Sequence, residues 1–597
     1  MAIVPRRVLF SINAAAAAAV LLLSSGCHKN AALPVQGPEP FTAQLPEVEG
    51  VQAILSLRHP ALVNQDLEKL MVNVPEAGIM RMALSQAAAY GYPDFPDIAA
   101  GSNIGVAILS LSGADLKAKS VVYVGFAKLK KGGGLWSLLN MAHLAAQETG
   151  EWVMFAKDQA SLAKLKSPEA VMAYLDKPQA DDIRLWGRVS PDLLAGLREA
   201  LMPGLDARIS SLTEDQQKAA HGYIDALYSW LLQLHSVDFS MGFDDFGFKI
   251  AESAQFLPET PIGTFLRFRE GPPPEVAGFI SADALGTMIF RQNPKAASDL
   301  TGGILDSLIA VDYPNGSGPL KELKAGIGPM MAAISGGGAA TFDLAVGKRN
   351  GREQVTPEFF YVISGRFTRE IVRAYARSSL DMSKGFSSFI AGKLASAPGA
   401  GALFPSFPYT YAEDSLSVDG VSFDCWTLPV VANGKEISRT TEYFGAVDGN
   451  FIMASSEAAL RKHLPALTAR TALADGIRVA EGPGEIARMS LNGGKLVDVF
   501  AEAAGLDLGD AGTKSDLAGL KADYAAGEPA SAVMTVGQAR GSVTLAIPYK
   551  FIEASVHFGR FMGAKKVNLF SLITGAGMPS AGSAQAAQTD SGTGHGP

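Results

Sequence analysis

The chain contains one unit of strand, turn and helix twice, and this repetition constrains its fold more than any other feature. The segment GEWVMFAKDQASLAKL spans residues 150–165, and GNFIMASSEAALRKHL spans residues 449–464. Each has a short apolar strand, then polar residues, then apolar positions at helical spacing. The sequence therefore predicts that one arrangement of strands and helices occurs twice along the chain.

Further pairs of similar segments occur in the same order in the two halves. They are residues 46–56 with 274–284, 98–109 with 334–344, 121–126 with 359–367, 182–201 with 485–505, and 238–252 with 532–547. In the first pair, each segment is expected to form a strand that leads into an amphipathic helix. In the third pair, Tyr123 and Tyr361 are in register. The whole chain, and not one segment, therefore follows the repeat.

These pairs predict the α+β class, with two tandem copies of a mainly antiparallel sheet domain and helices packed on the sheets. We expect copy 1 at residues 48–271 and copy 2 at residues 272–570. The offset between paired positions grows by roughly 60 residues after Tyr361, which predicts an insert at about residues 370–445. Two arrangements are compatible with this pattern. The strands of one copy continue the sheet of the other, or the copies lie side by side around a cleft.

One recurring local order has a counterpart among known proteins. Residues 447–460, VDGNFIMASSEAAL, show a turn with Asp-Gly, a strand, and a helix that opens with Ser-Ser-x-x-Ala-Leu. This order resembles a class of uncharacterised exported bacterial proteins with a duplicated α+β domain. The resemblance implies no activity.

The N-terminus has the layout of a secretory signal peptide. Arg6 and Arg7 precede an uncharged run, residues 8–23, which is short for a membrane span. The run ends in Ser-Gly-Cys at Cys27, which resembles the lipobox of bacterial lipoproteins. The resemblance implies that residues 1–26 are removed and that a diacylglycerol is attached to Cys27. His28 follows the cysteine, and by the enteric sorting rule this implies the outer membrane. The alternative is an ordinary signal peptide that leaves Cys27 as a free thiol.

The segments outside the two copies have compositions of their own. Residues 27–47 are rich in proline and are expected to form an extended tether, and residues 571–597 are expected to be disordered. The formal net charge of the whole chain is −8, and loss of Arg6 and Arg7 would make it about −10. An acidic chain of this kind argues against nucleic acid as a partner.

Motifs that are typical of catalysis are incomplete. Residues 161–164, SLAK, match the first tetrad of serine acyltransferases without its partner motifs. Residues 244–247, DDFG, fit a hairpin turn, or less well a carboxylate pair for a cation. Cys425 is expected to be a buried small hydrophobe, and residues 509–515, GDAGTKS, are expected to form a loop. The eight histidines have no metal-ligand spacing. The sequence therefore predicts no catalytic residue, no metal and no cofactor.

An aromatic stretch in the insert is the strongest candidate for binding. Phe404, Phe407, Tyr409 and Tyr411 alternate with prolines, and such side chains supply contact area at a low entropic cost. They are expected to bind a partner or an apolar ligand, or else to fold back and cap the sheet.

Three functions are compatible with these patterns. The first is a membrane-tethered envelope lipoprotein with a non-enzymatic binding or scaffold role toward a protein or polymer. The second is a carrier that encloses a lipid or other apolar ligand between the two sheet domains. The third is an enzyme whose site is assembled from distant residues. The missing catalytic motifs favour the first two.

Overall fold

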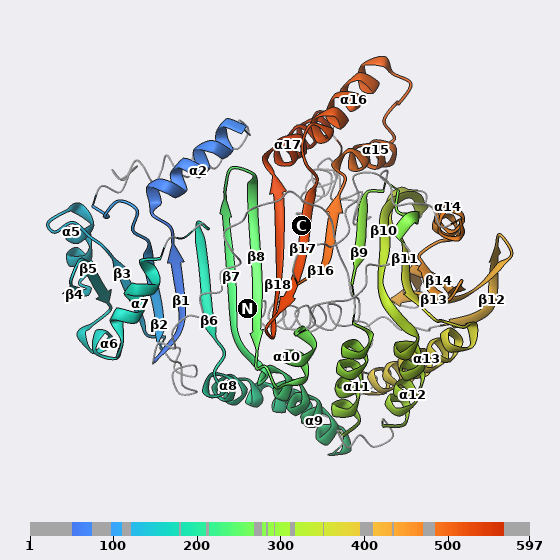
Figure 1. Cartoon of the computed structure of the whole chain (residues 1–597), viewed down its shortest axis with the longest axis horizontal. Helices are drawn as coiled ribbons and strands as arrows, with labels where there is room; N and C mark the ends of the chain where they lie inside the picture. The colour runs from blue at the N-terminus through green and yellow to red at the C-terminus, as the bar shows by residue number, and fades with distance from the viewer. Residues whose placement is uncertain are drawn as a thin grey trace, which may run out of the picture.

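The strands form one long antiparallel sheet, and helices lie above and below the strands in the view of Figure 1. The computed structural model describes the following residues, apart from a few positions inside these ranges: 50–73, 97–109, 121–210, 214–267, 277–310, 317–394, 410–469 and 484–567. The predicted signal peptide, the proline-rich tether and the predicted tail from residue 571 lie outside these ranges. The expected boundary between residues 271 and 272 also lies outside them.

The first half of the chain alternates strands with helices of very different lengths. In chain order its elements are β1 (Val51–Leu57), α2 (Pro60–Asn73), β2 (Ile104–Leu109), β3 (Tyr123–Ala127), α5 (Gly134–Met141), β4 (Ala145–Thr149), β5 (Trp152–Ala156), α6 (Gln159–Ala163), α7 (Pro168–Leu175), β6 (Ile183–Arg188), α8 (Pro191–Ile209), α9 (Glu214–Leu231), β7 (Leu234–Phe243), β8 (Gly247–Phe256) and α10 (Pro261–Leu266).

The second half has longer strands and one much longer helix. Its elements are η2 (Ala277–Phe279), β9 (Gly286–Phe290), α11 (Pro294–Ala310), α12 (Ser317–Ala333), β10 (Ile334–Arg349), β11 (Arg352–Gly365), α13 (Arg369–Leu394), β12 (Thr410–Val418), β13 (Val421–Ala432), β14 (Lys435–Val447), β15 (Asn450–Ala454), α14 (Glu457–Thr468), β16 (Glu485–Leu491), α15 (Gly493–Ala503), α16 (Ala511–Ala525), β17 (Ala530–Gly537), β18 (Arg540–Pro548) and α17 (Tyr549–Ala564).

The strands follow one another in the same order in both halves. The first half reads β4, β5, β3, β2, β1, β6, β7, β8 across the sheet. The second reads β14, β15, β11, β10, β9, β16, β17, β18, with β13 and β12 added beyond β14. In the second half, β9 and β16 are joined by backbone hydrogen bonds from Arg291 N to Ile486 O (2.8 Å) and from Asn492 N to Leu285 O (2.6 Å).

The two halves meet where β8 pairs with β18. The pairing is antiparallel from Gly247 opposite Pro548 to Gln255 opposite Arg540, with Ile250 opposite Leu545 near its middle. β8 and β18 occupy the same place in the two strand orders. The strands of one half therefore continue the sheet of the other, which decides between the two arrangements left by the sequence.

The repeated unit that the sequence identifies is present twice, and its helices are capped alike. After β5, the carboxylate of Asp158 accepts a hydrogen bond from Ser161 N (2.7 Å) and starts α6. After β15, the hydroxyl of Ser456 accepts one from Ala459 N (3.0 Å) and starts α14. Each cap satisfies a backbone N–H that the helix itself leaves unpaired.

One predicted pair was wrong. Residues 274–284 were expected to open with a strand like residues 46–56, but Ala277–Phe279 form a 3-10 turn and the strand is β9. The apolar residues of the 3-10 turn pack in one cluster with α14 and β11. Phe279 of the turn contacts Phe360 of β11 edge to face, with ring centroids 5.0 Å apart. Burial of that turn explains its apolar sequence without a strand.

The predicted insert, at about residues 370–445, includes β12 and β13 and most of α13 and β14. In the first half, the corresponding connection from β3 to β5 holds only the short helix α5 and the short strand β4. The insert places Val372 and Ala376 of α13 on the apolar side chains of Phe444 and Phe451. Helix α13 therefore covers a sheet face in the second half. Within the described ranges, no helix is long and apolar enough to cross a membrane.

Candidate functional site

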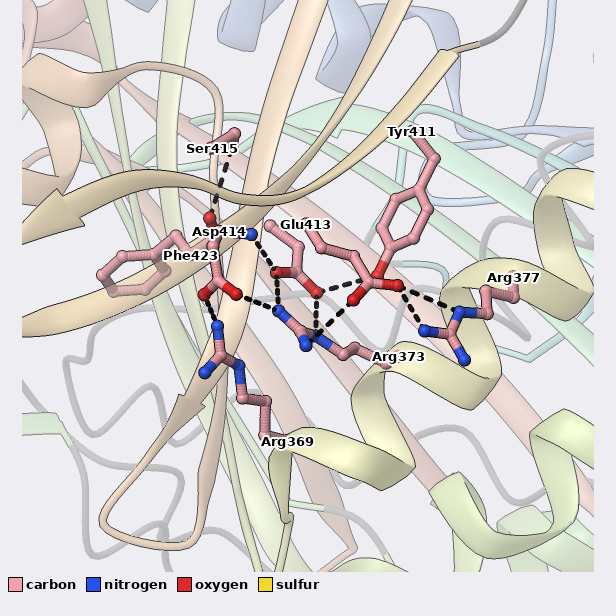
Figure 2. A network of polar contacts seen from close by, with 9 residues as sticks. Arg369, Arg373, Arg377, Tyr411, Glu413, Asp414, Ser415 and Phe423 are labelled. Carbon is pink, nitrogen blue, oxygen red and sulfur yellow. Dashed lines mark hydrogen bonds and ion pairs between the residues drawn. The ribbon is translucent and has the colours of Figure 1, made fainter.

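A network of charged side chains joins helix α13 to strands β12 and β13 (Figure 2). Arg373 donates two hydrogen bonds to the buried carboxylate of Asp424, from Nε to Oδ2 and from Nη2 to Oδ1, both 2.8 Å long. Asp414 N donates to Asp424 Oδ1 at 2.8 Å, and Glu413 pairs with Arg373 at 2.9 Å. One helical turn away, Arg377 Nε donates to Glu413 at 3.1 Å. All of these cations have carboxylate partners, so the network holds the insert together.

Tyr411 is the one predicted aromatic that the structure describes, and it belongs to this network. Its hydroxyl donates to Asp424 at 2.8 Å, and its ring stacks on Phe444 with centroids 6.1 Å apart. Burial, together with the Asp424 carboxylate, raises the pKa of Tyr411 above its ordinary value. Phe404, Phe407 and Tyr409 lie outside the described residues, so the binding role of the aromatic stretch stays a prediction.

A partly exposed apolar surface lies at the centre of the sheet, at positions that no sequence motif marks. We call it the apolar strip. It consists of two neighbouring cross-strand rows on one face of the sheet. The first row is Leu57, Ile183, Met241, Ile250, Leu545, Ala532 and Met489. The second row is Leu55, Leu185, Phe239, Glu252, Val543 and Met534. Both rows cross the junction of the two halves, and each side chain in them is half-buried or exposed.

The usual distribution of polar and apolar residues is inverted here. Leu57 and Leu185 of the strip are 37% and 39% exposed. On the opposite face of the same strands, Ser56, Arg184 and Ser240 are buried, with at most 9% exposure. Antiparallel sheets ordinarily cover their apolar face and leave the polar one to water. An exposed apolar patch on a soluble surface marks an interaction site.

The opposite face is covered by an apolar core that includes Ile54, and its polar side chains are paired there. Arg184 donates to Asp238 from Nε at 3.1 Å, and the hydroxyl of Ser56 is bonded to Gln179. The burial of Asp181 raises the pKa of its carboxyl group. The segment that follows α7 supplies Gln179 and Asp181, so it covers the polar side of β1, β6 and β7.

Helices border the apolar strip at both ends of its strands. On one side, Tyr549 of α17 stacks on Phe243 with ring centroids 6.3 Å apart. On the other side, Leu266 of α10 lies over Gly541 and packs with Val536. In Figure 1, α17 lies above the central strands and α10 lies below them. The strip therefore lies between contacts of α17 at one end of the central strands and contacts of α10 at the other end.

One charged side chain, Glu252, lies within the apolar strip. Glu252 occupies the middle of the second row, between Phe239 on β7 and Val543 on β18. Its side chain is exposed, and among the described residues it has no hydrogen bond or ion pair. A carboxylate surrounded by apolar side chains favours a partner that brings a positive charge.

The remaining sequence candidates have structural roles. Residues 244–247 form the predicted hairpin turn, where Asp244 Oδ1 accepts from Phe246 N (2.8 Å), and the two acidic side chains pair with Lys249 and Lys69. Ser161 is the third residue of the five-residue helix α6. The expected burial of Cys425 was wrong, because it is a free, half-buried thiol on β13.

Two further candidates are also explained by the structure. The expected loop at residues 509–515 was wrong, because α16 begins at Ala511, with the Asp510 carboxylate accepting from Thr513 N at 2.7 Å. His463 is buried between the rings of Phe279 and Phe360. Burial, with a further contribution from Lys462, lowers its pKa to about 4. Within the described part of the chain, no group of three or more His, Cys, Asp or Glu side chains could hold a metal ion.

Comparison with known proteins gives no relative for this chain. No protein-family model, no curated protein and no solved structure matches it.

Proposed function

We propose that this chain is a lipid-anchored protein of the bacterial envelope that acts by binding a partner through the apolar strip, and not by catalysis. The observation that carries the proposal is the inverted burial of β1 and β6, where leucines are exposed and serine and arginine are buried. When a partner covers exposed apolar area of this kind, the free energy of the complex is lowered by about 25 cal/mol per Å².

A photo-crosslinking experiment in cells tests this role. Leu185, which is 39% exposed in the strip, is replaced by benzoylphenylalanine in the full chain. The matched control carries the same substitution at Lys157, an exposed position before α6. Irradiation is expected to give a discrete larger species from position 185 and none from position 157. No product from position 185, or equal products from both, would contradict the proposal.

The lipid anchor is proposed from the N-terminal sequence, whose basic residues, apolar run and Ser-Gly-Cys at Cys27 are followed by a proline-rich tether. A diacylglycerol on Cys27 would hold the chain stably at the membrane. We expect the outer membrane, with the body facing the periplasm or the cell surface. Cys27→Ser should move the protein from the membrane fraction to the soluble fraction. A variant that stays with the membranes would rule out this anchor.

A carrier of an apolar ligand is the second candidate, and the chemistry of the strip favours it as well. Of the thirteen positions in its two rows, only Glu252 carries a polar side chain. Native mass spectrometry of protein purified gently without its lipid separates the candidates. A defined extra mass would support a carrier, and a bare mass would support a partner that is lost on purification.

We also propose that the two halves arose by duplication of one α+β domain. The shared order of eight strands and the pairing of β8 with β18 support it. An experimental structure in which residues 48–271 superpose on residues 272–570, with the insert left out, is the expected result. Halves that differ in strand order would contradict it.

A further inference from the structure

The apolar face that is open at the strip is covered in the second half by helices of the chain itself. Met534 of the strip packs in one cluster with Met288, Ala340 and Tyr361. Tyr361 also packs against a second cluster, which contains Val372 of α13. The strip and α13 therefore lie on the same face of the sheet, and the face is closed where α13 crosses it.

The connection of the first half that corresponds to α13 holds a much shorter helix. Between β3 and β5 it has α5, with 8 residues, whereas α13 has 26. Among the described residues, the exposed large hydrophobic side chains all belong to the first half, except Met489 and Leu508. Leu57 and Leu185 of the strip belong to this exposed set, as does Met489 at its other end.

The size of the strip matches that of one helix. Its first row crosses seven strands, which at about 4.8 Å per strand corresponds to about 29 Å. A helix of about 20 residues has this length at 1.5 Å per residue, and its diameter is about 10 Å. The bordering helices α10 and α17 contact Gly541 and Phe243, which lie beyond the two rows on either side, so the rows form a narrow apolar band.

The carboxylate of Glu252 in the strip indicates that such a helix must carry a cationic side chain. In the second half, Arg373 of α13 reaches from the helix to the sheet and pairs with Asp424. In the strip, Glu252 is the one acidic side chain, and no described residue supplies its cation. A helix seated on the strip would bury Glu252, and burial of a carboxylate without a cationic partner is strongly unfavourable.

We propose that the apolar strip docks an amphipathic helix of a partner protein, and that an Arg or Lys near the middle of its apolar face pairs with Glu252. This inference rests on the proposed binding role of the strip and names the partner's chemistry. It belongs to the helix-in-groove mode of recognition, in which apolar residues at helical spacing anchor the ligand. Three methionines in the rows, Met241, Met489 and Met534, suit such a site because their side chains adapt to the shape of a ligand.

Two helical peptides of 20 residues provide the probe. Both carry leucines at helical spacing, and they differ at one central position on the apolar face, which is Arg in one and Glu in the other. Their affinities are measured by fluorescence anisotropy against the full chain carrying Cys27→Ser. We expect the Arg peptide to bind at least 10-fold more tightly. Glu252→Lys should reverse this preference, and Glu252→Gln should reduce it to less than about 3-fold. Equal affinities for wild-type and Glu252→Lys protein would overturn the inference.

Other occupants of the apolar strip would give different experimental results. Binding of palmitate with no binding of either peptide would overturn the inference in favour of an acyl chain. Self-association of the protein that Leu185→Asp abolishes, again without peptide binding, would overturn it in favour of a second copy. A crosslinked product from position 185 in cells, together with no peptide preference, would refute the helix and keep the binding role. Absence of the crosslinked product would refute the binding role itself.

Discussion

A single carboxylate, Asp424, ties the long helix α13 to the strands beneath it. It is 3% exposed and accepts hydrogen bonds from Arg373, from the hydroxyl of Tyr411 and from the backbone N–H of Asp414. A buried carboxylate with four such bonds is stable only while its cation is present, because an uncompensated buried charge costs several kcal/mol, about 3 to 5.

Asp424→Asn is expected to lower the free energy of unfolding by about 3 kcal/mol, because it leaves Arg373 without its buried partner. Asp381→Asn, which changes an exposed carboxylate on the same helix, is the matched control and should cost less than about 0.5 kcal/mol. Urea unfolding measures both. Equal and small effects would show that Arg373 is held by its other carboxylates.

His463 makes the fold sensitive to acid. Its pKa is about 4 in the folded chain, against 6.5 as the ordinary value, because burial disfavours the charged ring. Between pH 6.5 and 4 the ring is therefore protonated in the unfolded chain but not in the folded chain. The free energy of unfolding falls as the pH falls through this window. The difference corresponds to about 3 kcal/mol at pH 4.

His463→Phe should remove this part of the pH dependence. Unfolding midpoints in urea, measured between pH 7 and pH 4, are expected to fall less steeply for the variant than for the wild type. A profile of His463→Phe that follows the wild type would contradict the buried neutral histidine.

At the scale of elements, the sequence predicts the faces of the strands but not their covering. In β7, Val237, Phe239 and Met241 alternate with Ser236 and Asp238, which identifies a strand with one apolar face. The pattern cannot predict that this face is the open one, because the cover over the opposite face comes from the distant segment after α7. The strip could have been suspected from the sequence, although its exposure could not.

This difference in covering predicts opposite responses of two leucines. Leu175→Ala empties a site in the core that is 1% exposed, and it should cost about 3 kcal/mol. Leu185→Ala removes a side chain of the same type that is 39% exposed, and it should cost less than about 1 kcal/mol. Chemical denaturation of the purified chain measures both. A large cost at position 185 would mean that its side chain is buried.

At the scale of the whole molecule, the joining of two halves into one sheet is the feature that the sequence could not supply. The repeats predict the elements of each half, because strand and helix periods are local. The pairing of β8 with β18 is not local, and the alternation of one strand is compatible with many partners. The same limit explains why the sequence left continuation and side-by-side packing as equal alternatives.

The junction also predicts a sensitive glycine. A Cβ atom on Gly247, at the start of β8, would stand 2.1 Å from the carbonyl oxygen of Ile547 on β18. Gly247→Ala should therefore lower the free energy of unfolding by about 2 kcal/mol or more. The matched control is Gly537→Ala, since a Cβ atom at Gly537 meets nothing within 4 Å. Calorimetry should show one transition in both variants, and an unshifted transition for Gly247→Ala would contradict the junction.

The proposed binding role requires that the apolar strip is exposed in the isolated protein. Hydroxyl-radical footprinting of the purified chain measures this through its methionines. Met489 in the strip is 38% exposed, whereas Met288 and Met562 are 1% and 0% exposed and serve as internal controls. The account predicts rapid oxidation of Met489 and protection of the other two. Protection of Met489 to the level of Met288 would show that the chain covers its own strip, and would contradict the proposed binding site.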